Sequence, residues 1–346
     1  MPQKISYASA GVNIDAAEDT KRAMAKSLET KNPLVLNRIG AFASLCDGSF
    51  PDYEHPILVC KTEEPGSKQK IAFQYKRRGG ICFDMIHHLI NDVIVMGAKP
   101  LFVQDLIVCG KMQKEVIKKL VDDIARACRA QGCVLTGGET SEQPSVLEAG
   151  MYVLGSSCIG VVEKSKIVDG SAIREGDTVL ALASSGVHTN GYTLIRALIK
   201  EDGGILNTRI GKKTFLDEIL VPHRCYYQEL KDLFARPALH GMAHITGGGI
   251  AGNLNRILPV GLDAKIDVSQ LRILPIFSLL KAKSGNDDPD MMKTFNLGVG
   301  MTLVVDPKAA DQIAKNLKKK GVDCYPIGKI VKGGSQKVRM EGTLKW

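Results

Sequence analysis

The order of apolar and polar residues in the first half of the chain alternates between a strand period and a helix period. Apolar runs predict strands at 57–60, 101–108, 133–135 and 152–162. Apolar residues at helical spacing predict amphipathic helices between these strands, over 84–97 and 113–130. Because strands and helices alternate in this way, the first half is predicted to fold as an α/β domain.

The second half begins after a polar, turn-rich segment at residues 163–176, which has the composition of a domain boundary. A strand is predicted at 178–183, followed by helices near 191–200, 225–235, 249–258 and 308–320. Residues 239–245 form a poor strand pattern. A chain of 346 residues exceeds one typical core, so two domains are predicted, 1–168 and 169–346.

The composition is that of a soluble globular enzyme and excludes several other classes. No apolar stretch is long enough to span a bilayer, and the N-terminus lacks the apolar core of a signal peptide. Nine cysteines without CxxC spacing predict reduced thiols and a cytoplasmic location. The net charge is +9, but no basic patch is interleaved with aromatic residues, so neither nucleic acid nor a membrane is expected as a partner.

The most informative polar segment is Ser184-Ser-Gly-Val-His-Thr-Asn-Gly191, which lies between a predicted strand and a predicted helix. A helix start exposes unpaired N–H groups and the positive end of the helix dipole, so it suits anions such as phosphate. The side chains of His188 and Asn190 add hydrogen-bond donors and acceptors. The segment therefore predicts a site for an anionic or amide-containing substrate.

The predicted helix at 84–97 carries a polar stripe. Its members are Asp84, His88, Asn91 and Asp92, which fall within an arc of roughly 100°. Two carboxylates on one side of an apolar helix suit a hard cation such as magnesium, and a solvated outer face has the same pattern. His87 and His88 taken singly are more typical of packing or surface histidines than of catalytic ones.

Two glycine-rich segments have several interpretations. Thr136-Gly-Gly-Glu-Thr140 is predicted to be a tight turn at a strand end, in which Glu139 holds a metal or a substrate amine or has no special role. Gly247–Gly252 matches GxGxxG spacing but lacks a clear preceding strand, so a phosphate-binding helix start is favoured over a dinucleotide fold. Beside it, His244 is predicted to be structural. Asn296 lies in another glycine-rich turn and is equally compatible with a functional role and with no special role.

Taken together, these segments resemble the phosphoribosylformylglycinamidine cyclo-ligase family, also called aminoimidazole ribonucleotide (AIR) synthetase. The matching segments follow one order along the chain: Ser6-Tyr7 with 10–12 and 15–16, Asn91-Asp92 with 97–100, 137–140, 160–164, 184–191, 246–249 and 294–301. The resemblance implies a two-domain α/β (α+β) fold whose N-terminal domains form a β-barrel across a homodimer. It also implies ATP-dependent ring closure of formylglycinamidine ribonucleotide in purine biosynthesis, with Mg²⁺ as a cofactor.

The resemblance assigns expected roles to individual residues. Catalysis is expected from His188, Asn190 and Glu139, and magnesium binding from Asp92, Glu139 and Glu63. ATP binding is expected from Gly66, Ser67, Lys68, Asp84, Asp105, Gly137, Gly138, Thr246, Gly247, Gly248 and Gly249.

The chain departs from the family pattern in regions associated with nucleotide binding. Residues 62–68 read T-E-E-P-G-S-K where the family usually has T-D-G-V-G-T-K, and 37–42 replace a glycine-rich segment. Ala8 stands where a lysine is usual. Two further hypotheses remain: another enzyme of the superfamily, such as selenophosphate synthetase or thiamine-monophosphate kinase, and a catalytically silent nucleotide-binding paralogue.

Overall fold

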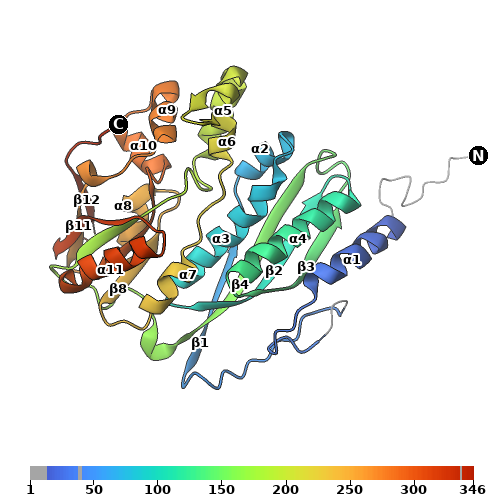
Figure 1. The fold of residues 1–346 in the computed structure, drawn as a ribbon, viewed down its shortest axis with the longest axis horizontal. Helices are drawn as coiled ribbons and strands as arrows, with labels where there is room; N and C mark the ends of the chain where they lie inside the picture. The colour runs from blue at the N-terminus through green and yellow to red at the C-terminus, as the bar shows by residue number, and fades with distance from the viewer. Residues whose placement is uncertain (1–13, 38–40, 336) are drawn as a thin grey trace, which may run out of the picture.

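The computed structural model of the chain describes residues 14–37, 41–335 and 337–346 (Figure 1). The family-like residues 6–12, the substituted Ala8 and residues 38–40 of the glycine-poor segment lie outside the described residues. Within the described residues, the chain forms a four-stranded sheet, a six-stranded sheet and a two-stranded ribbon.

The first sheet has the strand order β1-β4-β2-β3. Its strands are β1 (Pro56–Glu63), β2 (Lys99–Cys109), β3 (Val134–Glu142) and β4 (Tyr152–Glu163). The pair β2 and β3 is parallel and is joined by α4 (Lys114–Ala130), whereas β4 is antiparallel to β1 and to β2. The strands and helices predicted for this half are confirmed, although the helix predicted at 84–97 spans Ile81–Ile94.

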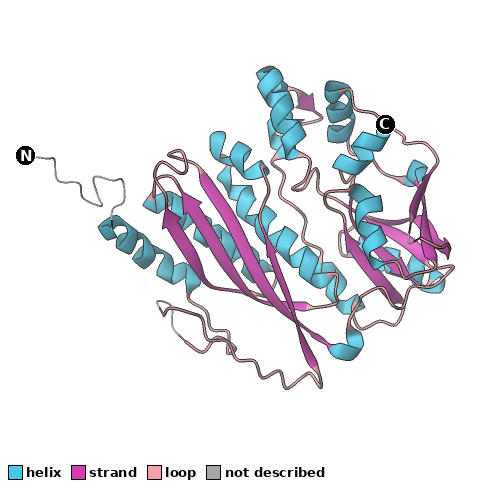
Figure 2. Cartoon of the chain, turned by 180° about the vertical axis from the view of Figure 1, so that it is seen from behind, coloured by secondary structure: helices cyan, strands magenta, loops and turns pink. Residues whose placement is uncertain are grey.

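The helices α1 (Ile14–Leu28), α3 (Ile81–Ile94) and α4 lie over one face of this sheet, as Figures 1 and 2 show. The apolar side chains of Met85, Leu89 and Val93 on α3 are fully buried because they pack into the core beneath the sheet. Its polar stripe is also buried, since Asp84 and Asn91 are fully covered. A solvated outer face for this stripe is therefore wrong: the stripe faces the second half of the chain.

The second sheet has the strand order β12-β9-β11-β5-β10-β8. Its strands are β5 (Thr178–Ala183), β8 (Leu239–His244), β9 (Leu262–Asp267), β10 (Val299–Val305), β11 (Cys324–Lys332) and β12 (Val338–Glu341). All neighbouring pairs are antiparallel except β9 and β12. The ribbon pairs β6 (Arg209–Ile210) with β7 (Lys213–Thr214).

Several helices flank the second sheet. They are α5 (Tyr192–Glu201), α6 (Phe215–Ile219), α7 (Tyr227–Leu230), α8 (Gly249–Leu254), α9 (Pro275–Ser284), α10 (Asp288–Thr294) and α11 (Pro307–Lys319). The helices predicted near 225–235 and 249–258 are shorter than predicted, because each passes into a 3₁₀ turn, at Lys231–Leu233 and Asn255–Ile257. In the first half, α2 (Lys68–Gln74) precedes α3.

Two sequence predictions about strands are wrong. Residues 239–244 form β8, in which polar His240 is buried because its Nδ1 lies 2.7 Å from the Asp177 carboxylate. The segment 136–140 is not a turn at a strand end but part of β3, beside an irregularity in its pairing with β2. Gly138 is required there, because a Cβ would lie 2.1 Å from the Asp105 carbonyl oxygen.

The face of the first sheet opposite α3 and α4 carries exposed apolar side chains. They are Leu58, Leu106, Val153 and Ile159, at 37–56% exposure. Both large sheets are open, so the described residues of one chain contain no closed barrel. All nine cysteines are unpaired, as the sequence predicts. No helix in the described ranges is long and apolar enough to cross a membrane.

Candidate active site

The start of α2 meets the 184–191 loop of the second half. The ammonium of Lys68 is buried and donates hydrogen bonds to Asp84 Oδ1 at 2.8 Å and to the carbonyl oxygens of Val221 at 2.7 Å and His188 at 3.1 Å. Asp84 Oδ1 also accepts from the backbone N–H of His223 at 2.7 Å. Two residues expected to bind ATP are thus brought together, and they connect the two halves.

Burial works against both charges of this pair. It lowers the pKa of Lys68 and raises the pKa of Asp84 to about 6, while the attraction between the two side chains opposes each shift. The pair persists because the lysine ammonium has two further acceptors and the carboxylate has a backbone donor. Nearby, a Cβ on Gly66 would lie 3.0 Å from the Thr189 carbonyl oxygen, so the 62–68 loop packs directly on the 184–191 loop.

The 184–191 loop has a fixed, partly left-handed backbone. His188 has a φ of +64°, and Gly191 has a φ of +80° with no room for a Cβ, which would lie 2.1 Å from the Phe295 ring. The buried amide of Asn296 donates to the carbonyl oxygens of Gly186 and Val187. Asn296 therefore shapes the loop, which supports its structural interpretation.

The imidazole of His188 lies inside the loop and is 1% exposed. Its Nε2 accepts a hydrogen bond from the Ser185 N–H at 3.1 Å, so Nδ1 carries the proton. Among the described residues, Nδ1 has no hydrogen-bond partner. Burial lowers the pKa of His188 well below its ordinary value, so the ring is neutral and offers one unused donor.

Histidines from both halves meet beside this loop. His88 of α3, His223 of the 220–226 segment and His244 of β8 join His188. The Nε2 atoms of His223 and His244 are 3.0 Å apart, and the rings of His188 and His223 stack with centroids 3.9 Å apart. Thr189 Oγ1 lies 3.0 Å from His88 Nδ1 and 3.3 Å from His223 Nδ1.

Asp92 lies at one end of this histidine cluster. Its Oδ1 lies 2.7 Å from His244 Nδ1, so His244 is held by a carboxylate, consistent with its predicted structural role. Burial acts to raise the pKa of Asp92, but the hydrogen bond from His244 and the neighbouring charges hold it below its ordinary range. Burial and the proximity of His244 lower the pKa of His88 to about 4, so the His88 ring is neutral at pH 7.

The three carboxylates expected to bind magnesium are not all together. Lys61 Nζ lies 2.6 Å from Glu63 Oε1 and 3.0 Å from Asp92 Oδ2, so these two acids converge on one cation. Glu139 is exposed and pairs in register with Leu106, on the sheet face opposite α3. Within one chain, Glu139 is therefore separated from Asp92 and Glu63.

Asp105 and Gly138 lie side by side on β2 and β3. Burial raises the pKa of Asp105 to about 7, because the side chain is enclosed beneath the sheet. A Cβ on Gly138 would lie 2.4 Å from Asp105 Oδ1. Gly137 has a φ of +144°, which L side chains rarely adopt. The contact fixes the position of Asp105, an expected ATP-binding residue.

The 246–249 segment lies next to Asn190. A Cβ on Gly247 would be 3.3 Å from Asn190 Oδ1, so two segments expected to bind ligands are adjacent. Gly248 has a φ of +94° at the start of α8, and a Cβ on Gly249 would lie 1.9 Å from the Met292 carbonyl oxygen. Thr246 Oγ1 donates to Asn253 Oδ1 at 3.1 Å.

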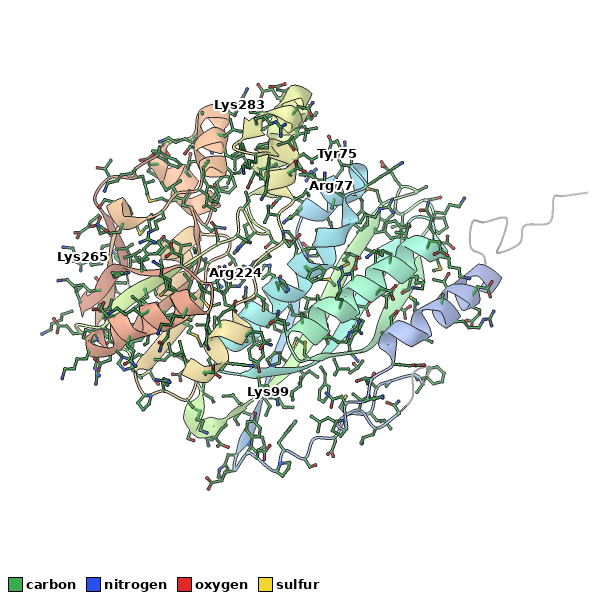
Figure 3. All side chains as sticks on the ribbon, viewed as in Figure 1. Tyr75, Arg77, Lys99, Arg224, Lys265 and Lys283 are labelled. Carbon is green, nitrogen blue, oxygen red and sulfur yellow. The ribbon has the colours of Figure 1, made fainter. Side chains whose placement is uncertain are left out.

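Sequence reasoning missed several residues at this junction, including His223, Thr189 and Lys61. The backbone of Arg224, which Figure 3 places between the two halves, accepts from the Asn91 amide at 2.8 Å. A hollow of about 450 Å³ beside α2 was also not predicted. Its lining includes the cations Lys70, Lys76 and Arg78 and the acid Glu148. Among the residues of the histidine cluster, helical spacing pointed only to His88, which lies on the predicted polar stripe.

Comparison with known proteins assigns the chain to a family. Models described as AIR synthase related protein, N-terminal domain, and AIR synthase related protein, C-terminal domain, match residues 55–162 and 174–341. The phosphoribosylformylglycinamidine cyclo-ligase of Chromobacterium violaceum is 40% identical over 330 residues, which cover 94% of this chain and 95% of that protein. The chain belongs to the phosphoribosylformylglycinamidine cyclo-ligase family. The cyclo-ligase of Brevibacillus brevis is 38% identical over 346 residues, or 99% of each chain.

Solved structures share the fold of this cyclo-ligase family member at lower identity. The hydrogenase maturation protein HypE in complex with ATP gives a TM-score of 0.68 at 17% identity, covering 96% of this chain and 92% of that one. Thiamine-monophosphate kinase from Stenotrophomonas maltophilia gives 0.62 at 16% identity, covering 95% and 97%. At these identities the likeness concerns the fold alone.

Proposed function

We propose that this chain converts formylglycinamidine ribonucleotide into aminoimidazole ribonucleotide with ATP, closing the imidazole ring in purine biosynthesis. The observation that carries the proposal is near-full-length similarity, at 38–40% identity, to relatives named for this reaction. In this reaction the formamide oxygen is phosphorylated, the neighbouring nitrogen attacks the activated carbon, and phosphate leaves.

The 184–191 loop provides a group suited to the formamide. His188 Nδ1–H is a donor without an acceptor among the described residues, on a ring that burial keeps neutral. Such a donor matches the formamide oxygen, which is the atom that becomes phosphorylated. Asn190, adjacent to Gly247, is proposed to orient the substrate amidine.

The carboxylates of Asp92 and Glu63 are proposed to hold Mg²⁺. Two carboxylates already converge on the Lys61 ammonium, so this position attracts cations and supplies the oxygen ligands that magnesium prefers. When bound, the ion neutralises the charge of the ATP phosphates. Glu139 remains a proposed catalytic and metal residue, but from the opposite sheet face.

ATP is proposed to contact three parts of the chain. They are the 62–68 loop, the group formed by Asp105, Gly137 and Gly138, and the 246–249 segment. In support, a HypE chain of the same fold has been solved in complex with ATP. Lys68 is proposed to position the loop rather than to contact phosphate, since its ammonium is enclosed by Asp84 and two carbonyl oxygens.

The chain is also proposed to form a homodimer in which the first sheets of two copies close a barrel. The support is the row of exposed apolar side chains on the open face of that sheet, which water would otherwise surround.

The direct test is to assay purified protein for aminoimidazole ribonucleotide after adding formylglycinamidine ribonucleotide, ATP and Mg²⁺. We expect product formation that requires all three and falls sharply in His188→Asn. Product formation from selenide or phosphorylation of thiamine monophosphate would instead favour another superfamily activity. ATP binding without any turnover would favour the silent paralogue.

A further inference from the structure

We propose that His88, Asp92 and His244 form a binding site for a transition-metal ion of the zinc class at the junction of the two halves. One ligand atom from each residue lies within 4.8 Å of the others. Two imidazoles and one carboxylate are the ligand set of many open zinc sites. The site shares Asp92 with the proposed magnesium position and differs from it by its two imidazole ligands, which magnesium does not prefer.

The backbone places the three ligands from two directions. His88 and Asp92 are four residues apart on α3, so they share one helix face, and His244 ends β8 on the opposite side. His88 Nε2 lies 3.9 Å from Asp92 Oδ2, and His244 Nδ1 lies 2.7 Å from Asp92 Oδ1. Ligand atoms around tetrahedral zinc are about 3.3–3.5 Å apart, so movements below about 1 Å assemble the site.

The far nitrogens of both imidazoles already have hydrogen-bond partners. His88 Nδ1 is held by Thr189 Oγ1 at 3.0 Å, and His244 Nε2 by His223 Nε2 at 3.0 Å. Metal-binding histidines nearly always use the second ring nitrogen in this way, because the partner fixes ring orientation and tautomer. Here these partners leave the near nitrogens facing Asp92. His244 Nδ1 donates to Asp92 in the free site, so ion binding requires the other tautomer, in which Nε2 carries the proton and donates to His223 Nε2.

The burial of the site suits a metal ion. The side chains of His88 and Asp92 are 10% and 20% exposed, so an ion can enter while most of the site is protected. Imidazole nitrogens favour zinc, cobalt and nickel over magnesium, which prefers oxygen ligands.

Lys61 competes with a bound ion. Its ammonium lies 3.0 Å from Asp92 Oδ2, and its side chain is 36% exposed, so it can move into solvent. Removing this charge should therefore tighten metal binding. A purely structural role of Lys61 would not predict tighter metal binding when its charge is removed.

A second trio, His188, His223 and His244, also has ligand atoms within 4.8 Å. It is the weaker candidate because the rings of His188 and His223 are stacked, with an angle of 22° between their planes. Lone pairs in two parallel ring planes do not converge on one ion. Variants of His188 and His88 separate the two trios.

The experiment uses the full-length chain carrying Cys60→Ser, which removes its exposed thiol, after treatment with a chelator. Calorimetric titration with Zn²⁺ and visible absorption with Co²⁺ should give one ion per chain with tetrahedral coordination. We expect His88→Ala and Asp92→Asn to weaken binding by at least ~100-fold, and Thr189→Val by about 10–100-fold. Lys61→Met should tighten it by at least about fivefold.

The control variants are His55→Gln, an exposed histidine outside the cluster, and His188→Asn, and both should bind zinc as the parent does. Circular dichroism verifies that each variant is folded. If His88→Ala does not fold, the opposite effects of Lys61→Met and Thr189→Val decide the question. The proposal is overturned if no saturable binding occurs, if His88→Ala binds like His55→Gln, or if His188→Asn alone loses the ion.

Discussion

The buried pair Lys68–Asp84 should contribute far more to stability than an exposed pair of the same length. Lys68 and Asp84 are each 1% exposed, with N and O 2.8 Å apart. Arg77 and Asp217 also join the region around α2 to the second half, at 2.9 Å, but are 52% and 34% exposed. The two pairs therefore match in distance and differ in burial.

The expected magnitudes follow from desolvation. Lys68→Met leaves the Asp84 carboxylate buried beside two carbonyl oxygens that have lost their donor, so the free energy of unfolding should fall by about 3–5 kcal/mol. Arg77→Met should lower it by at most about 1 kcal/mol, because water screens the exposed pair. The double variant Lys68→Met/Asp84→Leu should recover most of the loss, since it removes both buried charges.

Urea unfolding monitored by fluorescence and circular dichroism measures these differences. Asp84→Asn provides a further check, because the unpaired Lys68, whose pKa burial lowers, can lose its proton. The destabilisation by Asp84→Asn should therefore shrink as the pH rises toward the ordinary pKa of lysine, because the unfolded chain then binds more protons than the folded variant. Equal losses in Lys68→Met and Arg77→Met, or a double variant no more stable than Lys68→Met, would refute the reasoning.

Four further outcomes are expected. Burial lowers the pKa of His88 to about 4, so as the pH falls the unfolded chain protonates its histidine before the folded chain does. The free energy of unfolding should therefore fall by up to about 3 kcal/mol between about pH 6.5 and 4. In chelator, the urea midpoint of His88→Gln should depend less on pH over this range. His188→Asn, which tolerates the left-handed backbone, should cut turnover by roughly 100-fold with a small change in melting temperature. Asp92→Asn should raise the Mg²⁺ concentration needed for half-maximal turnover, and an unchanged requirement would exclude it as a ligand. Leu106→Glu should convert a particle of about twice the chain mass into a monomer in light scattering, whereas a monomeric parent would refute the dimer.

Elements with a strong apolar period could be predicted from the sequence, as α3 and α4 were. The strand β8 could not, because its His240 is buried through a hydrogen bond to Asp177, 63 residues away. The segment at Gly138 was predicted to be a turn, because the local sequence does not show that this glycine lets Asp105 of the adjacent strand pack closely against it. Both errors arise where a distant residue decides the local structure.

The candidate site was predictable only where residues share an element. Helical spacing placed Asp84, His88 and Asp92 on one stripe. The sequence could not indicate that His223, in a segment without regular period, would meet His244 and stack on His188. The separation of Glu139 from Asp92 likewise depends on which sheet face each residue occupies, and that follows from strand register.

The burial of the α3 stripe by the second half has a consequence for synthesis of the chain. The side-chain amide of Asn91 donates a hydrogen bond to the Arg224 carbonyl oxygen and accepts one from the Tyr226 N–H. These partners follow Asn91 by 133 and 135 residues. At about 5–20 residues per second, a ribosome needs roughly 7–27 s to make that interval. During this time the face of α3 that the second half will bury is exposed on the nascent chain, and part of this face is apolar. Its final packing is therefore completed late in translation or after release, when chaperones that shield such surfaces have most effect on yield.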